Sequence, residues 1–223
     1  TAQQSFFYPS VGMSAILSKM LKLPAFVDFL KFRTSWASVG SAISPNISSA
    51  WRYEYIPSTG TYHTVTYKFP DNFYPERTNS LEAGVTATLF KEALSVKFTL
   101  YQSNTKNQTF LRQITLGGAY NREYIQAGNV RNRGLELTVG YNKKWTDSRW
   151  SVNMSYSMNH NRIVRLLDNP NETLRQGGLN GCEVILTQGG TMGDLYTFTG
   201  FKRNQQGDIQ VNADGQVMQI ELP

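Results

Sequence analysis

The residues whose side chains most often carry out chemistry are few in this sequence. The chain has 223 residues, with two histidines, His63 and His160, and one cysteine, Cys182. The histidines lie too far apart to form a helical metal-binding pair, and a lone cysteine can form neither an internal disulfide nor a thiolate cluster. No order of serine, histidine and aspartate points to hydrolysis. We therefore expect no metal, no cofactor and no enzymatic activity.

A short acidic segment near the C-terminus has only part of a calcium-binding pattern. Residues 208–215 read DIQVNADG, but no glutamate stands where such a loop needs its last ligand. The pair Asp214 and Gly215 is typical of a tight turn. The sequence therefore predicts a turn or short hairpin here rather than a metal site.

A loop rich in aromatic residues is the strongest candidate for a binding surface. Residues 51–74 hold eight aromatics, whereas aromatics make up 13% of the whole chain. Aromatic rings stack on sugar rings and on peptide side chains, and tyrosine hydroxyls add hydrogen bonds. The candidate ligand contacts are Trp51, Tyr53, Tyr55, Tyr62 and Tyr67. The alternative is that these rings pack the loop upon itself or against a partner protein.

The elements that must position these residues have the period of β-strands. Apolar and polar residues alternate over residues 81–89 and 93–101, and only residues 90–92 separate the two segments. This spacing predicts a tight hairpin. A second hairpin is predicted from residues 135–141 and 150–159, and a looser pair from residues 10–17 and 30–37. The connection of the looser pair contains Pro24 and has room for a short helical turn.

The six predicted strands are about ten residues long, nearly twice the usual length in soluble proteins. A tilted strand needs that length to cross a bilayer. Short turns join the strand pairs at one end, whereas the long polar stretches 40–78, 107–133 and 165 onward lie at the other. Outer-membrane barrels have the same asymmetry, with short periplasmic turns and long external loops. The predicted fold class is all-β, a segment of an antiparallel transmembrane β-barrel.

Each predicted strand has one apolar and one polar face. If the apolar face meets lipid, the polar face lines the lumen or contacts a plug. The charged residues of the polar face are Lys31, Arg33, Glu82, Lys97 and Glu136. Aromatic residues gather beside the short turns, where an interfacial girdle is expected. They are Phe90, Tyr141, Trp145 and Trp150.

Composition agrees with this prediction and excludes some other classes. Charged residues make up 17% of the chain, against roughly 25% in an average soluble domain. The net charge is +6 at pH 7, but the basic residues are scattered, without a nucleic-acid-binding motif. No nucleic-acid partner is expected. Alternation alone also fits a soluble sandwich or lipocalin-like barrel, so a soluble or surface-attached β-rich carbohydrate- or peptide-binding protein without transport stays open.

Several motifs resemble those of one known family. The most specific reads YPERTNSLEAG over residues 74–84 and continues as YQSNTKN over residues 101–107. Two further strand motifs are LKFRTSWASVG at residues 30–40 and NVRNRGLEL at residues 129–137. The opening FYPSVG and the loop GGTMGDLY add to the likeness, although Thr191 stands where proline is usual. Together they are similar to the SusC/RagA family of TonB-linked outer-membrane transporters of Bacteroidetes.

This resemblance implies a large plugged barrel of about 22 strands, located in the bacterial outer membrane and surrounded by its lipid. It implies TonB-dependent active import of a large nutrient, an oligosaccharide or a peptide, with a SusD-like surface lipoprotein as a lid. Residues 1–223 are expected to be part of the barrel domain. The N-terminal extension, the TonB-contacting segment, the plug and the remaining strands are expected to lie outside this chain.

Overall fold

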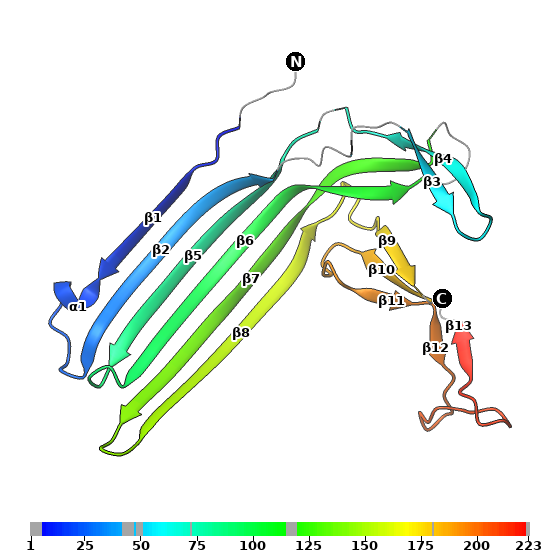
Figure 1. The fold of residues 1–223 in the computed structure, drawn as a ribbon. Coiled ribbons are helices and arrows are strands. Elements are labelled where there is room, and N and C mark those ends of the chain that lie inside the picture. The colour runs from blue at the N-terminus through cyan, green and yellow to red at the C-terminus, as the bar shows by residue number, and fades with distance from the viewer. Residues whose placement is uncertain are drawn as a thin grey trace.

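The computed structural model describes residues 6–41, 47, 51–71, 73–114, 120–179 and 181–221. Its main feature is a wall of long, neighbouring antiparallel strands (Figure 1). They are β1 (Ser10–Ile16), β2 (Val27–Ser41), β5 (Glu76–Leu89), β6 (Leu94–Gln113), β7 (Arg122–Lys144) and β8 (Arg149–Arg165). The predicted all-β class is confirmed. No helix among the described residues is long and apolar enough to span a membrane.

The three predicted strand pairs are confirmed. β5 and β6 pair from Leu89 opposite Leu94 to Arg77 opposite Lys106. β7 and β8 pair from Lys144 opposite Arg149 to Asn129 opposite Arg165. β1 pairs with β2, and the connection between them contains the short helix α1 (Leu17–Met20). β2 also pairs with β5, and β6 with β7, which gives the wall its order β1-β2-β5-β6-β7-β8.

The register places the apolar side chains of neighbouring strands in rows on one face, because directly opposed residues share a face. This apolar face comprises Leu81, Ala83, Val85, Ala87 and Leu89 of β5, Leu94, Val96, Phe98 and Leu100 of β6, Leu135, Leu137, Val139 and Tyr141 of β7, and Trp150, Val152, Met154, Tyr156 and Met158 of β8. Within the part of the chain that the structure describes, no second sheet covers this face, since Leu81, Leu100 and Trp150 are 54%, 47% and 62% exposed. A soluble sandwich would bury such a face.

On the polar face, glycines make room for long side chains. Arg33 lies across Gly84 and donates a hydrogen bond to Thr99 Oγ1 at 2.8 Å. A Cβ atom at Gly84 would come within 2.8 Å of Arg33 Nε. Tyr101 lies across Gly134 in the same way, with its hydroxyl 2.6 Å from the place of a Cβ atom. The polar groups of this face therefore lie along the sheet and contact neighbouring strands.

β6 and β7 are longer than predicted, and the predicted loop over residues 107–133 is wrong. The two strands continue as a ribbon that bends away from the wall (Figure 1). Their register skips Asn107 and Gly128, which lie between the pairs Lys106–Asn129 and Gln108–Ala127. Both residues have left-handed backbone conformations, with φ of 58° and 87°. The ribbon was missed because its sequence lacks a regular alternation of apolar and polar residues.

The other long connections contain short strands. The stretch 40–78 includes a hairpin of β3 (Trp51–Ile56) and β4 (Thr61–Lys68). Beyond β8, one small sheet consists of β9 (Leu174–Leu179), β10 (Cys182–Leu186) and β11 (Leu195–Thr197), and β12 (Thr199–Phe201) pairs with β13 (Gln219–Glu221). The predicted turn near Gly215 is confirmed by the bridge between Val211 and Val217.

A small hydrophobic core lies at the end of the wall that bears these long connections. Its buried residues come from β6, β7, β8 and the segments that follow, and they are Phe110, Val130, Ile163, Leu166, Leu174 and Leu186. The segment after β10 is tied to β8 by backbone hydrogen bonds between Ile163 and both Gly189 and Gly190. The core thus holds the loops of this end onto the upper part of the wall.

A candidate ligand face on the β3–β4 hairpin

The aromatic loop forms the β3–β4 hairpin, whose two faces differ. Four rings that the sequence predicted as ligand contacts lie on one face, with 55–70% of each side chain exposed. They are Trp51, Tyr53, Tyr55 and Tyr62, and we call them the aromatic face. The rings of Trp51 and Tyr53 meet edge to face with centroids 5.4 Å apart, and those of Tyr55 and Tyr62 are 5.2 Å apart.

Tyr67, the fifth predicted contact, lies on the opposite face of the hairpin. It is 3% exposed, its ring stacks on Tyr124 of β7 at 5.4 Å, and its hydroxyl donates to Glu54 Oε1 at 3.0 Å. A direct ligand contact does not fit so buried a ring. Tyr67 instead anchors the hairpin on the β6–β7 ribbon.

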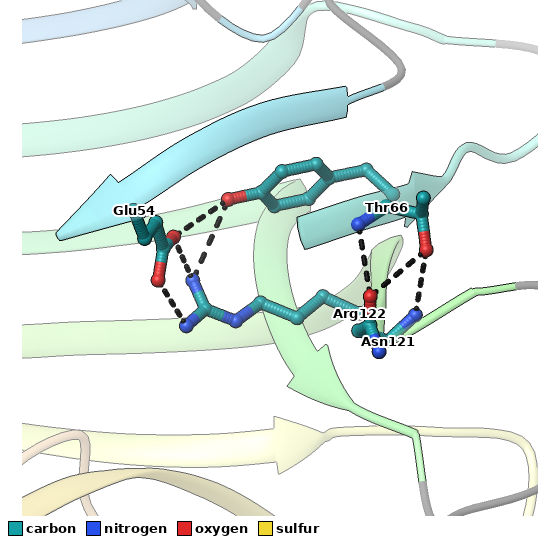
Figure 2. Close-up of polar contacts among 5 residues, drawn as sticks. Glu54, Thr66, Asn121 and Arg122 are labelled. Carbon is teal, nitrogen blue, oxygen red and sulfur yellow. Dashed lines mark hydrogen bonds and ion pairs between the residues drawn. The ribbon is translucent and has the colours of Figure 1, made fainter. Parts of the chain in front are cut away.

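The anchor includes a two-pronged ion pair, which Figure 2 shows in close-up. Arg122 Nη1 and Nη2 donate to the two carboxylate oxygens of Glu54 at 2.6 and 2.7 Å. Beside this pair, the backbone N–H of Thr66 donates to Asn121 Oδ1 at 3.0 Å, and the N–H of Asn121 donates to the Thr66 carbonyl at 3.0 Å. The geometry fixes both the position and the tilt of the hairpin, because paired charged hydrogen bonds are directional.

The anchor perturbs the acidity of two of its members. Burial raises the pKa of Glu54, but the hydrogen bonds from Arg122 and Tyr67 outweigh it and hold that pKa below its usual 4.5. Burial and the hydrogen bond to Glu54 raise the pKa of the Tyr67 hydroxyl above its usual 10.0. Both shifts favour the same arrangement at neutral pH, a charged Glu54 that accepts from a protonated Tyr67.

A second group of charges extends the anchor along the ribbon. Glu123 accepts from Arg112 at 2.6 Å and from Lys68 at 2.9 Å, and Arg112 also donates to Glu172 at 2.5 Å. The hydrogen bonds from Arg112 and Lys68 lower the pKa of Glu123. The hairpin, the ribbon and the connection after β8 are therefore held together by one set of ion pairs.

A hollow of about 640 Å³ lies beside this set of charges. Its lining includes charged groups of both signs and an aromatic ring, namely Lys68, Glu123, Arg165, Asp168 and Tyr124. Its volume lies within the range of ligand pockets in proteins, which is roughly 300–1,000 Å³. The charges of this lining are paired with each other, Lys68 with Glu123 and Arg165 with Asp168, so the hollow is polar without an excess of either sign.

The five charged residues expected to line the lumen share the polar face of the wall. The row Arg33, Gly84, Thr99, Glu136 runs across four strands, and Lys31 and Lys97 lie in the next row on either side of Thr86. Arg33 and Glu82 form an ion pair at 3.1 Å. The wall thus brings Arg33 and Glu82 together, whereas the described residues provide no ion-pair partner for Lys31, Lys97 or Glu136.

The aromatic residues expected at a membrane interface lie at the short-turn end of the wall. Phe90 is in the β5–β6 turn, Trp145 is in the β7–β8 turn, and Tyr141 and Trp150 flank the latter, all exposed. Sequence reasoning missed Phe26, which stacks on Phe90 with centroids 5.6 Å apart. Phe26 precedes β2 and has no alternating neighbours that would have marked it.

Sequence reasoning also missed the anchor residues Glu54, Arg122 and Tyr124. The signal for Glu54 was present, because Arg52, Glu54 and Ile56 alternate with the exposed rings of β3. The same alternation along β4 puts Tyr67 and Tyr62 on opposite faces of the hairpin. Their partners on β7 could not have been found from local pattern, since 55 positions separate Tyr67 from Arg122. Among the described residues, no group of histidine, cysteine or acidic side chains could hold a metal ion.

Residues 1–215 match the family described as TonB dependent receptor-like, beta-barrel. TonB-dependent receptor P3 of Formosa agariphila is 25% identical over 205 residues, an alignment that covers 86% of this chain and 20% of that protein.

Solved structures with the same fold include the RagAB peptide importer in two states. The closed-closed state matches with a TM-score of 0.68 at 16% identity, over 97% of this chain and 25% of that chain. The open-open state matches with a TM-score of 0.69 at 14% identity, over 99% of this chain and 25% of that chain. At such identities the likeness concerns the fold alone. The chain spans about a fifth to a quarter of the length of these relatives.

Proposed function

The chain belongs to the TonB-dependent receptor β-barrel family, and on this premise we propose that it forms part of the wall of an outer-membrane transporter. The transporter would import a large nutrient, an oligosaccharide or a peptide, by a TonB-dependent mechanism. The observation that carries the proposal is the two-faced wall, with an exposed apolar face and a polar face that holds the Arg33–Glu82 pair. Lipid outside and a polar lumen inside suit these two faces.

The dimensions of the apolar face support this orientation. Its rows extend along β8 from Trp150 to Met158, close to the 9–11 residues that a tilted strand needs to cross a bilayer. In the proposed orientation, Trp150 and the other girdle rings lie at the periplasmic interface. Lys31, Arg33, Glu82, Lys97 and Glu136 then face the lumen or the plug. The β3–β4 hairpin extends from the external end.

The rest of the machinery belongs to parts of the longer protein and to partners. A plug, an N-terminal extension, a TonB-contacting segment and the remaining strands would complete the barrel, and TonB would displace the plug by force. A SusD-like lipoprotein would cover the external loops. This chain contributes no covalent chemistry in the proposal; its residues bind, exclude lipid from the lumen and hold the external hairpin in position.

The aromatic face is the proposed ligand contact. Its four exposed rings offer stacking surfaces for sugars or peptide side chains, and the anchor on the far side of the hairpin keeps these rings in a fixed orientation. The neighbouring polar hollow would bind the polar backbone of a peptide. A nutrient held here lies at the external entrance of the lumen.

The test is uptake by a strain in which the full-length gene is deleted and then restored. We expect deletion to abolish growth on one class of nutrient, with peptides and oligosaccharides supplied separately as the sole source, and full-length protein to restore it. Replacement of Trp51, Tyr53, Tyr55 and Tyr62 by alanine is expected to lower the apparent affinity for the nutrient about tenfold or more, since rings in contact contribute about 0.5–1.5 kcal/mol each beyond their buried area.

The matched control is Trp145→Ala, which removes an exposed ring at the opposite end of the wall. This variant is expected to retain uptake. Unchanged affinity for the nutrient in the fourfold variant would exclude a ligand role for the aromatic face. If that variant instead no longer co-purified with the lipoprotein, the aromatic face would be assigned to lipoprotein binding. Wild-type uptake in a strain without TonB would contradict the proposed transport mechanism.

A further inference from the structure

The side of the wall that carries the apolar face becomes strongly basic toward the end that bears the long connections. The first row beyond Ala83 and Leu100 contains Arg133 and His160, and the next contains Arg131 and Arg162. A third row contains Arg77, Lys106 and, on β8, Arg165. We call Arg77, Lys106, Arg131, Arg133 and Arg162 the basic rim. The rim follows the upper border of the apolar face across β5, β6, β7 and β8.

The described residues provide no ion-pair partner for the five residues of the rim. The described residues of these rows include no carboxylate, and the neighbours of the rim residues are amides such as Gln102, Asn104 and Asn79. Among the ion pairs of the described residues, one reaches these rows and joins Arg165 to Asp168 at the end of β8, and none includes a residue of the basic rim. The Nε atom of Arg131 is buried and lacks a hydrogen-bond partner within the chain. An anionic partner from outside the chain would complement this row of cations.

A hollow of about 730 Å³ adjoins the rim on its membrane side. Its floor is apolar, formed by Leu81, Leu100, Leu135 and Met158, and its upper border includes Arg133 and His160. A site with a hydrocarbon floor below and guanidinium groups above matches a molecule with an acyl chain and an anionic head. Guanidinium groups bind phosphate oxygens through two parallel hydrogen bonds.

We propose that the basic rim and this hollow bind a phosphate-bearing lipid of the external leaflet, with its acyl chain on the apolar floor and its phosphate between Arg131, Arg133 and Arg162. The inference rests on the membrane orientation of the proposed function. It goes beyond that function, because it concerns the lipid-facing surface and not the import route. Bound lipid would fix the height of the wall in the membrane at its external border.

The test uses the full-length protein in a neutral detergent, titrated with dioleoyl phosphatidic acid and followed by native mass spectrometry. Dioleoyl phosphatidylcholine, which has the same acyl chains and no net charge, is the lipid control. Each surface cation is worth about fivefold in affinity for anionic lipid, so the triple variant R131Q/R133Q/R162Q is expected to bind phosphatidic acid about a hundredfold more weakly. The same three residues changed to lysine are expected to retain most of the binding.

The protein control is K143Q/K144Q/R149Q, which removes three charges at the opposite end of β7 and β8 and is expected to bind like wild type. An equal loss in this variant, or equal binding of the two lipids by wild type, would overturn the proposed site. Displacement of the lipid by inorganic phosphate would also overturn it, since the acyl floor would then contribute nothing. Lipid binding by a full-length protein that fails to import any nutrient would support the site while contradicting the proposed function.

Discussion

At the scale of single residues, ionisable groups determine how firmly the external hairpin is held. Glu54 is about one-third exposed in its side chain and pairs with Arg122 through both carboxylate oxygens. A charged hydrogen bond contributes about 1.5–3 kcal/mol in protected surroundings, and solvent screening reduces this pair to about 1 kcal/mol. The hairpin buries few residues besides Val65 and Tyr67, so this contribution matters to its position.

The anchor should therefore weaken in acid. A carboxyl group whose folded pKa is lowered stabilises the folded arrangement above its unfolded pKa, and this stabilisation is lost as the pH falls through the folded pKa. For Glu54 and Glu123, whose usual pKa is 4.5, the loss begins below about pH 4.5. Spin labels on Ser58 and Gln102, with Cys182 changed to serine, are expected to report a broader distance distribution there than at pH 7.

The variant Glu54→Gln removes the titration of residue 54 and leaves that of Glu123. It is expected to show a broader distribution than wild type at pH 7 and a smaller change between pH 7 and pH 4. A distribution in wild type that stays unchanged down to pH 3 would contradict the anchoring role of these carboxylates.

A second example of local chemistry is the turn at Thr191, which stands where the resembling family usually has proline. The backbone N–H and the hydroxyl of Thr191 both donate to the carboxylate of Asp194, at 2.8 and 2.5 Å. These hydrogen bonds lower the pKa of Asp194. Proline has no N–H and could not make this contact, so the turn is closed here by side-chain hydrogen bonding.

At the scale of the strands, the proposed membrane orientation depends on which face of the wall meets lipid and which faces the lumen. Leu137 and Tyr156 lie opposite each other in the middle row of the apolar face, while Glu136 and Ser157 lie opposite each other in the next row on the polar face. The two rows are one residue apart along the strand, so they lie at nearly the same depth in the membrane. Substitutions in the two rows therefore compare a lipid-facing position with a lumen-facing one.

Arginine at the two positions should have unequal effects. Leu137→Arg is expected to lower the free energy of unfolding of the full-length barrel by about 2–4 kcal/mol, the cost of arginine on the lipid face near the bilayer midplane. Ser157→Arg, which faces Glu136, is expected to cost less than about 1 kcal/mol. Urea titrations of the two variants in lipid vesicles measure both values. Equal costs, or a larger cost for Ser157→Arg, would contradict the assignment of the faces.

At the scale of the whole molecule, the wall among the described residues is an open sheet. β1 pairs only with β2, and β8 has no partner along the membrane part of its outer edge. Backbone groups without partners are costly in hydrocarbon, at several kcal/mol each. The wall therefore needs the other strands of its barrel on both sides.

This has a direct consequence for residues 1–223 expressed alone behind an outer-membrane export signal. We expect no urea-resistant, heat-modifiable band on electrophoresis, whereas the full-length protein is expected to give one. Such a band from the isolated segment would indicate that the wall closes its own edges, by self-association or by rearrangement, and would contradict the view that it depends on the rest of the barrel.

The sequence by itself determined the wall. Alternation of period two, strand length and short turns were enough to predict the three hairpins, the faces of Glu82 and Leu81, and the helical turn after Ile16, because each of these depends on residues close together in the chain. Motif resemblance added the family, which the comparisons confirm.

Only the tertiary structure decided which aromatic residues of the hairpin are exposed and what holds them. Tyr67 and Tyr62 have the same residue type, and their separation into anchor and exposed ring depends on Arg122 and Tyr124, far along the chain. The β6–β7 ribbon likewise became visible only through its pairing, and the basic rim only through the register of β5 to β8. Pairing between segments far apart in the chain sets the anchor and the basic rim, and a local pattern in the sequence does not encode the partner. The ribbon pairs residues close in the chain, such as Arg112 with Glu123, but its residues lack the alternation that marks a strand.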